Sequence, residues 1–143
     1  MKNFRNAIAA IMIAVSLGVA MPAMPAQAGA KDPLFVNLTS DDGHRINMAR
    51  TFGGKQMERG HPLTVFLNDR AVFAASTAYG ERFAGQQKTI ADLLAAGATI
   101  SVCPLCMKHY RVKQEDLLRG LKVGNPELTC DTLFADNAKT LTW

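Results

Sequence analysis

One short apolar segment constrains the fold of this chain more than any other. Residues 61–69, HPLTVFLND, contain the unbroken run Leu63 to Leu67, which is rich in side chains that favour β-strands. A strand with one solvated face alternates apolar and polar residues, whereas a continuous apolar run predicts burial on both faces, as in a parallel sheet. Parallel strands need crossover connections, which are usually helices.

The segments on either side of this run alternate between strands and helices. Further strands are predicted at 33–40, 98–103 and 139–143, with a short strand or loop at 121–125, and helices are predicted at 43–58, 88–97, 113–120 and 125–137. Residues 70–76 are expected to extend a strand or pair as a hairpin, and residues 78–86 to form a polar loop. The sequence therefore predicts an α/β fold, a single three-layer domain with a mostly parallel sheet of about five strands flanked by helices.

Local signals mark the ends of several predicted helices. Gly97 is the expected stop of the helix at 88–97. Asn125 is a cap candidate, and Pro126 stands at the first position of the last helix. The helix at 43–58 contains Gly53 and Gly54. It is expected to be weak at that point, because glycine costs about 1 kcal/mol relative to alanine inside a helix.

The first 28 residues have the three parts of a secretory signal peptide. Basic residues stand at positions 2 and 5, an uncharged apolar run of 14 residues occupies 7–20, and an A-x-A cleavage site lies at 26–28. A membrane span needs about 20 apolar residues, so this run is too short for an anchor. We expect cleavage after Ala28, which leaves a domain of residues 29–143 in the periplasm or outside the cell.

Charge and composition disfavour several classes of partner. Without the signal peptide, the chain has 14 Lys and Arg against 12 Asp and Glu, a net charge of +2, with no basic cluster. This gives no support to nucleic-acid binding. No second apolar run of spanning length follows, so no membrane contact is expected after cleavage. All three cysteines lie in the mature domain, and an odd number leaves at least one thiol unpaired in an oxidising compartment.

Cys103 and Cys106 stand in the segment SVCPLCMKHY, residues 101–110. Cys103 ends a predicted strand, and in open α/β sheets functional groups gather beyond the carboxyl ends of the strands. If a helical turn begins at Pro104, its free N–H groups lie beside the Cys103 sulfur and favour the thiolate. Cys103 is therefore the candidate nucleophile, and Cys106 is the candidate resolving thiol.

Other interpretations of the cysteine pair stay open. Cys103, Cys106, Met107 and His109 form a local cluster of soft ligands that would suit copper or zinc, although a closed zinc site usually has two well-separated ligand pairs. The pair is also compatible with a structural or redox disulfide. No dinucleotide or phosphate-loop motif is present, and we expect no cofactor. Cys130 lies in a predicted helix and is expected to pack in the core.

Four segments occur in a characteristic order: LTVFLNDRAVFAAS, LLAAGATISVCPLCMKHYRV, EDLLRGLKVG and the terminal AKTLTW. Together they resemble the DsrE/DsrF-like family of small α/β sulfur-relay proteins, over most of the mature chain. The resemblance implies a compact parallel-sheet domain that assembles into homotrimers or homohexamers. It also implies sulfur transfer through a persulfide on the cysteine that ends the strand before a short helix, which is Cys103 here. The motif CPLCM resembles the exported branch of this family.

Two features depart from the relay pattern. Tyr110-Arg111-Val112 stands where the family commonly has a glycine before an aliphatic residue, so the loop below the site is expected to differ. The signal peptide also separates this protein from cytoplasmic relay partners. Two functions remain open: a sulfur carrier or sulfurtransferase-like protein that uses Cys103, with an unknown donor or acceptor, and a non-catalytic binding protein whose cysteine pair is structural or holds a metal.

The export prediction is tested at the amino terminus of the protein made in its own cell. The A-x-A site predicts a mature chain that starts at Gly29, or within about two residues of it. Edman sequencing or terminal-peptide mass spectrometry reads this end directly. A membrane-bound protein that keeps Met1 would contradict the prediction.

Overall fold

The computed structural model describes residues 31–143, so the predicted signal peptide, residues 1–28, lies outside the described part. The strands are β1 (Leu34–Leu38), β2 (Leu63–Leu67), β3 (Thr99–Val102), β4 (Lys122–Val123) and β5 (Lys139–Thr142). The α-helices are α1 (Gly43–Glu58), α2 (Gly80–Ala95), α3 (Pro104–Tyr110) and α4 (Pro126–Leu133), and the 3₁₀ helices are η1 (Asp69–Ala75), η2 (Thr77–Tyr79) and η3 (Gln114–Asp116). No helix within 31–143 is long and apolar enough to cross a membrane.

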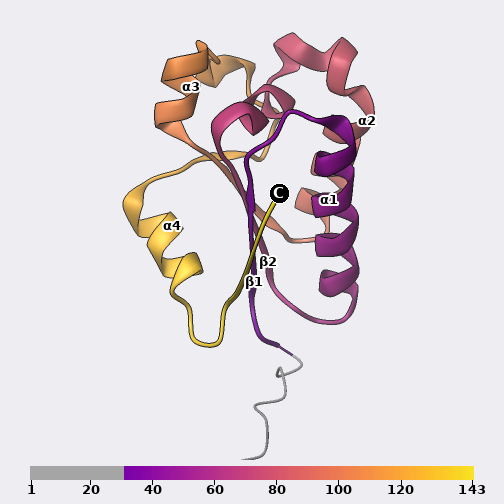
Figure 1. Ribbon diagram of the computed structural model, residues 1–143, viewed down its shortest axis with the longest axis vertical. Helices are drawn as coiled ribbons and strands as arrows, with labels where there is room; N and C mark the ends of the chain where they lie inside the picture. Colours follow the sequence, from indigo (N-terminus) through magenta and orange to yellow (C-terminus); the bar gives the residue numbers. More distant parts are fainter. Residues whose placement is uncertain (1–30) are drawn as a thin grey trace, which may run out of the picture.

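The strands form one parallel sheet in the order β4-β3-β2-β1-β5. Helices α1 and α2 lie on one side of this sheet and α4 lies on the other (Figure 1). The chain moves outward from β1 to β4 and then returns across the sheet to β5. Because crossovers are right-handed, this change of direction puts α4 on the opposite side from α1 and α2. The arrangement confirms the predicted α/β fold.

The hydrophobic core lies between the sheet and helices α1 and α2. Alternate residues of the three central strands are buried there: Leu34, Val36, Leu38, Leu63, Val65, Leu67, Ile100 and Val102. The opposite face is covered less completely, since no residue of α4 is fully buried. Thr64 and Phe66 of β2 are accordingly half-buried. The expected burial of β2 is therefore correct for one face and only partial for the other.

Three segments differ from their predicted structure. Residues 70–76 belong largely to the 3₁₀ helix η1, which Asn68 caps by accepting a hydrogen bond from the Asp69 N–H. Its alanine and valine residues are buried, whereas Phe73 is partly buried. Residues 78–86 are not a loop, because α2 already begins at Gly80. Residues 113–120 contain only the short η3 turn instead of a helix.

Gly53 lies where α1 packs against Leu63, the first residue of β2. A Cβ atom at this position would be 3.1 Å from both Cδ atoms of Leu63, which is tighter than ordinary contact. A Cβ atom at Gly54 would be 3.4 Å from the Leu93 Cδ2 atom, at the edge of ordinary contact. The helix α1 continues through both glycines. Close packing therefore explains Gly53 but does not require Gly54.

The two glycines make a matched pair for a stability test. Gly54→Ala should stabilise the protein by about 0.5–1 kcal/mol, because alanine loses less backbone entropy in a helix. Gly53→Val should destabilise it by about 1–3 kcal/mol, because the added methyl groups overpack against Leu63. Urea unfolding measures both changes. A Gly53→Val variant as stable as the wild type would contradict the close packing of α1 on β2.

Candidate functional site

The residues that follow the central strands meet at the carboxyl edge of the sheet. Asn68 follows β2, and its N–H donates a 2.8 Å hydrogen bond to the Leu38 carbonyl at the end of β1. Cys103 follows β3, and its N–H donates a 3.0 Å hydrogen bond to the Leu67 carbonyl at the end of β2. The pairing of β2 with β3 therefore brings Asn68 close to the cysteine motif. The predicted place of Cys103, at the end of its strand, is correct.

Cys103 is the N-cap of α3. Its backbone is extended, with φ −65° and ψ 114°, and Pro104 begins the helix. The Cys103 Sγ atom accepts a 3.2 Å hydrogen bond from the Cys106 N–H. The Cys103 sulfur thus satisfies one of the free backbone N–H groups in the first turn of α3. The side chain of Cys103 is buried, with 8% exposed, so a reaction partner must approach along the edge of the sheet.

Cys106 is held differently, by the loop that follows β2. Its S–H donates to the Asn68 Oδ1 atom at 3.0 Å, and its Sγ accepts from the Asp69 N–H at 3.2 Å. The Asn68 Oδ1 atom also accepts from the Asp69 N–H at 2.8 Å. Asp69 adopts a left-handed backbone, with φ 46°, which turns its N–H toward these two acceptors. The loop thus provides both an acceptor and a donor for this thiol.

The surroundings of Cys106 keep it protonated. Burial of the side chain and its hydrogen bond with Cys103 raise the pKa of Cys106 to about 11, against a smaller lowering by the Asp69 N–H. At neutral pH roughly one Cys106 thiol in ten thousand is ionised, because each pH unit below the pKa reduces the thiolate tenfold. The two cysteines of the motif therefore have unequal roles available to them.

A polar and aromatic group surrounds the loop that holds Cys106. The Tyr110 hydroxyl donates to the Asp69 carboxylate, and this hydrogen bond raises the pKa of Tyr110. Arg70 lies over the Tyr110 ring, at 6.0 Å from its centroid. Arg70 also makes two hydrogen bonds, at 2.9 and 2.8 Å, to the carboxylate of Asp41. This pairing lowers the pKa of Asp41. It also connects the segment that follows β1 to η1, which contains Arg70.

The other sequence candidates do not join the site. Met107 is buried in the core. The His109 ring packs edge-on against the Tyr110 ring, with 4.6 Å between the ring centroids. Within residues 31–143 no three His, Cys, Asp or Glu side chains gather where they could hold a metal ion. The expectation that Cys130 packs in the core is wrong, because Cys130 is exposed on α4. All three cysteines are free thiols.

The loop after α3 keeps a conformation that glycine would favour. Arg111 has φ 57° and ψ 33°, which is left-handed, and its N–H donates to the carbonyl groups of α3. Val112 is buried, and its N–H donates a 2.9 Å hydrogen bond to the Met107 carbonyl. The helix α3 therefore ends in a left-handed residue that is not glycine, and the difference of this loop from the family pattern stays a prediction.

Sequence comparison assigns the domain to a family. The DsrE/DsrF-like family matches residues 34–130, a range that includes both cysteines of the motif. The chain belongs to the DsrE/DsrF-like family. Family membership indicates a sulfur-relay role at the level of the family. A search of curated proteins finds no match to the sequence.

Solved structures share the fold of this DsrE/DsrF-like protein. MTH1491 from Methanobacterium thermoautotrophicum, a protein of unknown function, matches with a TM-score of 0.66 and 12% identity over 79% of this chain and all of its own. The ychN protein of E. coli matches with a TM-score of 0.55 and 13% identity, covering 79% and 99% of the two chains. BT1422 from Bacteroides thetaiotaomicron, a conserved protein of unknown function, matches with a TM-score of 0.57 and 19% identity, over 78% of this chain and 95% of its own. These identities establish the fold alone.

The unequal thiols predict unequal alkylation. In reduced native protein, iodoacetamide should modify Cys106 slowly at pH 8, where about one thiol in a thousand is ionised, because its pKa is about 11. The rate of Cys106 alkylation should rise about tenfold for each pH unit up to pH 10, because the thiolate fraction rises tenfold. Peptide mapping measures each cysteine separately, and exposed Cys130 is the internal control for the reagent. A plateau in the Cys106 rate below pH 9 would contradict the raised pKa.

Two variants separate the contribution of Asn68 from a general loosening of the loop. Asn68→Ala removes the acceptor of the Cys106 S–H and leaves the Asp69 N–H facing the sulfur, so its alkylation profile should move to lower pH. Asn37→Ala is the control, because it removes another partner of Asn68 without touching sulfur. Its profile should match the wild type.

Proposed function

We propose that this DsrE/DsrF-like protein carries sulfur as a persulfide on Cys103. The observation that carries the proposal is the asymmetry of the two thiols. Cys103 Sγ accepts a helix N–H, whereas burial and the neighbouring Cys103 raise the pKa of Cys106 to about 11 and keep it a protonated thiol, whose S–H donates to Asn68. Family membership supports the same chemistry. Cys103 is the nucleophile in this proposal, and Cys106 is the resolving thiol.

Loading exchanges one sulfur–sulfur bond for another. The Cys103 thiolate attacks the outer sulfur of a persulfide donor, R–S–SH. A bond forms between Cys103 Sγ and that sulfur, the donor S–S bond breaks, and the donor leaves as the thiolate R–S⁻, which takes up a proton from water. No net oxidation occurs, because the number of sulfur–sulfur bonds is unchanged.

Release can follow two routes. An acceptor thiolate can attack the outer sulfur, which transfers the sulfur and restores the Cys103 thiolate. Alternatively the Cys106 thiolate attacks Cys103 Sγ, expels hydrosulfide and closes a Cys103–Cys106 disulfide, which a dithiol reductant must then reduce with two electrons. The pKa of Cys106, at about 11, makes this second route slow at neutral pH. The geometry thus favours a carrier over a releaser of hydrosulfide.

We place this chemistry in the periplasm or outside the cell and in a homotrimer or homohexamer. The signal-peptide pattern supports export. The α4 side of the sheet supports self-association, because Phe134, just after α4, has 78% of its surface exposed, and Thr64 and Phe66 of β2 on this side are only half-buried. Exposed apolar surface of this kind is typical of interfaces.

The carrier role is tested by loading reduced protein with glutathione persulfide and measuring intact mass. The wild type should gain one sulfur at Cys103, and Cys103→Ser should gain none. At pH 10, where Cys106 is partly ionised because its pKa is about 11, Cys106→Ser should keep the sulfur longer than the wild type, because no nearby thiol can displace it; at neutral pH the two should differ little. Cys130→Ser is the matched control, since Cys130 is exposed and away from the pair, and it should load like the wild type.

Two results would reverse parts of the proposal. Uptake of sulfur at Cys106 in the Cys103→Ser variant would exchange the two roles. If no cysteine takes up sulfur while the wild type binds copper or zinc stoichiometrically, the cysteine pair is a soft-metal site instead. The hydrogen bond from the Cys106 S–H to Asn68 argues for the sulfur carrier and against the metal site, because a cysteine must lose its proton to bind a metal.

A further inference from the structure

A cavity lies at the opposite end of the sheet from the cysteines. It is open to solvent, has a volume of about 300 Å³ and is lined by residues of α1, the start of β1 and β5. Leu34 and Lys139 are the first residues of β1 and β5, and His61 comes just before β2. Cys103 instead follows the carboxyl end of β3. The cavity therefore cannot contact the thiol chemistry directly.

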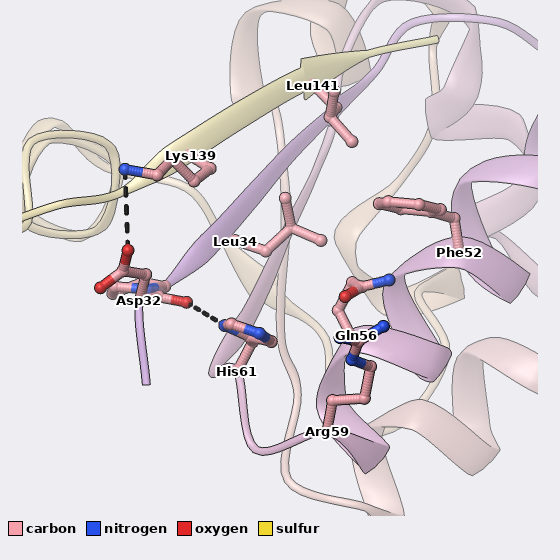
Figure 2. Close-up of a pocket in the computed structure, with 9 residues that line it drawn as sticks. Asp32, Leu34, Phe52, Gln56, Arg59, His61, Lys139 and Leu141 are labelled. Atoms are coloured by element: carbon pink, nitrogen blue, oxygen red, sulfur yellow. Dashed lines mark hydrogen bonds and ion pairs between the residues drawn. The ribbon is translucent and has the colours of Figure 1, made fainter. Parts of the chain in front are cut away.

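Apolar side chains form two walls of this cavity. Leu34 forms the floor, Phe52 projects from α1, and Leu141 projects from β5 (Figure 2). Phe52 and Leu141 have 43% and 37% of their surface exposed, which is high for large apolar residues. The Trp143 ring supports Phe52 with its centroid 6.0 Å away. Binding cavities for small molecules are typically mostly apolar, with a few polar groups that orient the ligand.

Basic and hydrogen-bonding groups lie at the rim. Arg59 and Gln56 come from the α1 side and Lys139 from β5 (Figure 2). Arg59 has no ion pair with any residue of the described chain from 31 to 143. Lys139 lies 3.7 Å from an Asp32 carboxylate oxygen, a loose ion pair. His61 contributes its Nδ1 atom to a 2.8 Å contact with the Asp32 carbonyl.

The charge balance of the cavity selects the type of ligand. Among the Arg, Lys, Asp and Glu residues that line the cavity, Arg59 and Lys139 outweigh Asp32 by one positive charge. A dianion such as a phosphate monoester would stay undercompensated, whereas a monoanion matches the balance. The Arg59 guanidinium suits the planar carboxylate group, and the apolar walls suit a hydrocarbon body. From this arrangement, we infer that the cavity binds a small monocarboxylate with an aromatic or aliphatic body, at a site separate from the cysteines.

The inference is tested with benzoate as the probe. Isothermal titration calorimetry should detect one benzoate per chain, and NMR titration should move the resonances of Phe52, Leu141 and Trp143. Benzamide keeps the ring without the charge, and acetate keeps the charge without the ring. Each should bind at least tenfold more weakly than benzoate, because each lacks one half of the recognition.

Variants separate the cavity from general charge attraction. Arg59→Gln should weaken benzoate binding at least fivefold. Arg45→Gln removes an exposed charge from the same helix, α1, at its far end, and should leave binding unchanged. Cys103→Ser should also bind normally, so the result is independent of the proposed sulfur chemistry. Absence of benzoate binding, equal weakening by Arg45→Gln and Arg59→Gln, or shifts confined to residues around Cys103 would each overturn the inference.

Discussion

The parallel pairing of β2 with β3 is the constraint on which the site depends. Leu67 pairs with Val102 at the ends of these strands, so the next residues of both strands reach the same edge of the sheet. One of them is Asn68 and the other is Cys103. A slip of one residue in this register would turn every side chain of a strand to the other face. It would also separate Cys106 from the loop that bonds its thiol.

The two cysteines lie within one turn of each other at the start of α3, but their sulfur atoms have different hydrogen-bond partners. Cys103 accepts a hydrogen bond from a helix N–H at the N-cap of α3. Cys106 donates its proton to the Asn68 side chain. A pair with two easily ionised thiols would close a disulfide readily in an oxidising compartment. A protonated second thiol would protect the proposed persulfide on the first, so the asymmetry would suit a carrier that holds sulfur until an acceptor arrives.

Local sequence signals predicted much of the fold and half of the site. The strand that precedes Cys103 and the cap residues of α4 are set by neighbouring residues, so they could be predicted. Asn68 was missed because its role requires β2 and β3 to be neighbours, and sequence spacing does not give strand order. Its position directly after a buried strand was the available signal. Cys130 was placed wrongly because an amphipathic helix does not reveal whether another layer covers it, and α4 is covered incompletely.

The end of α3 completes the positioning of the thiols from the other side. A left-handed residue other than glycine costs about 1 kcal/mol or more, yet Arg111 occupies that conformation. The buried Val112 and its hydrogen bond to Met107 fix the chain on either side of it. With the helix ended there, Tyr110 faces Asp69 and donates to its carboxylate. Asp69 in turn directs its N–H to Cys106. The left-handed end of α3 is therefore connected to the Cys106 thiol through two hydrogen bonds, one from Tyr110 to Asp69 and one from the Asp69 N–H to Cys106.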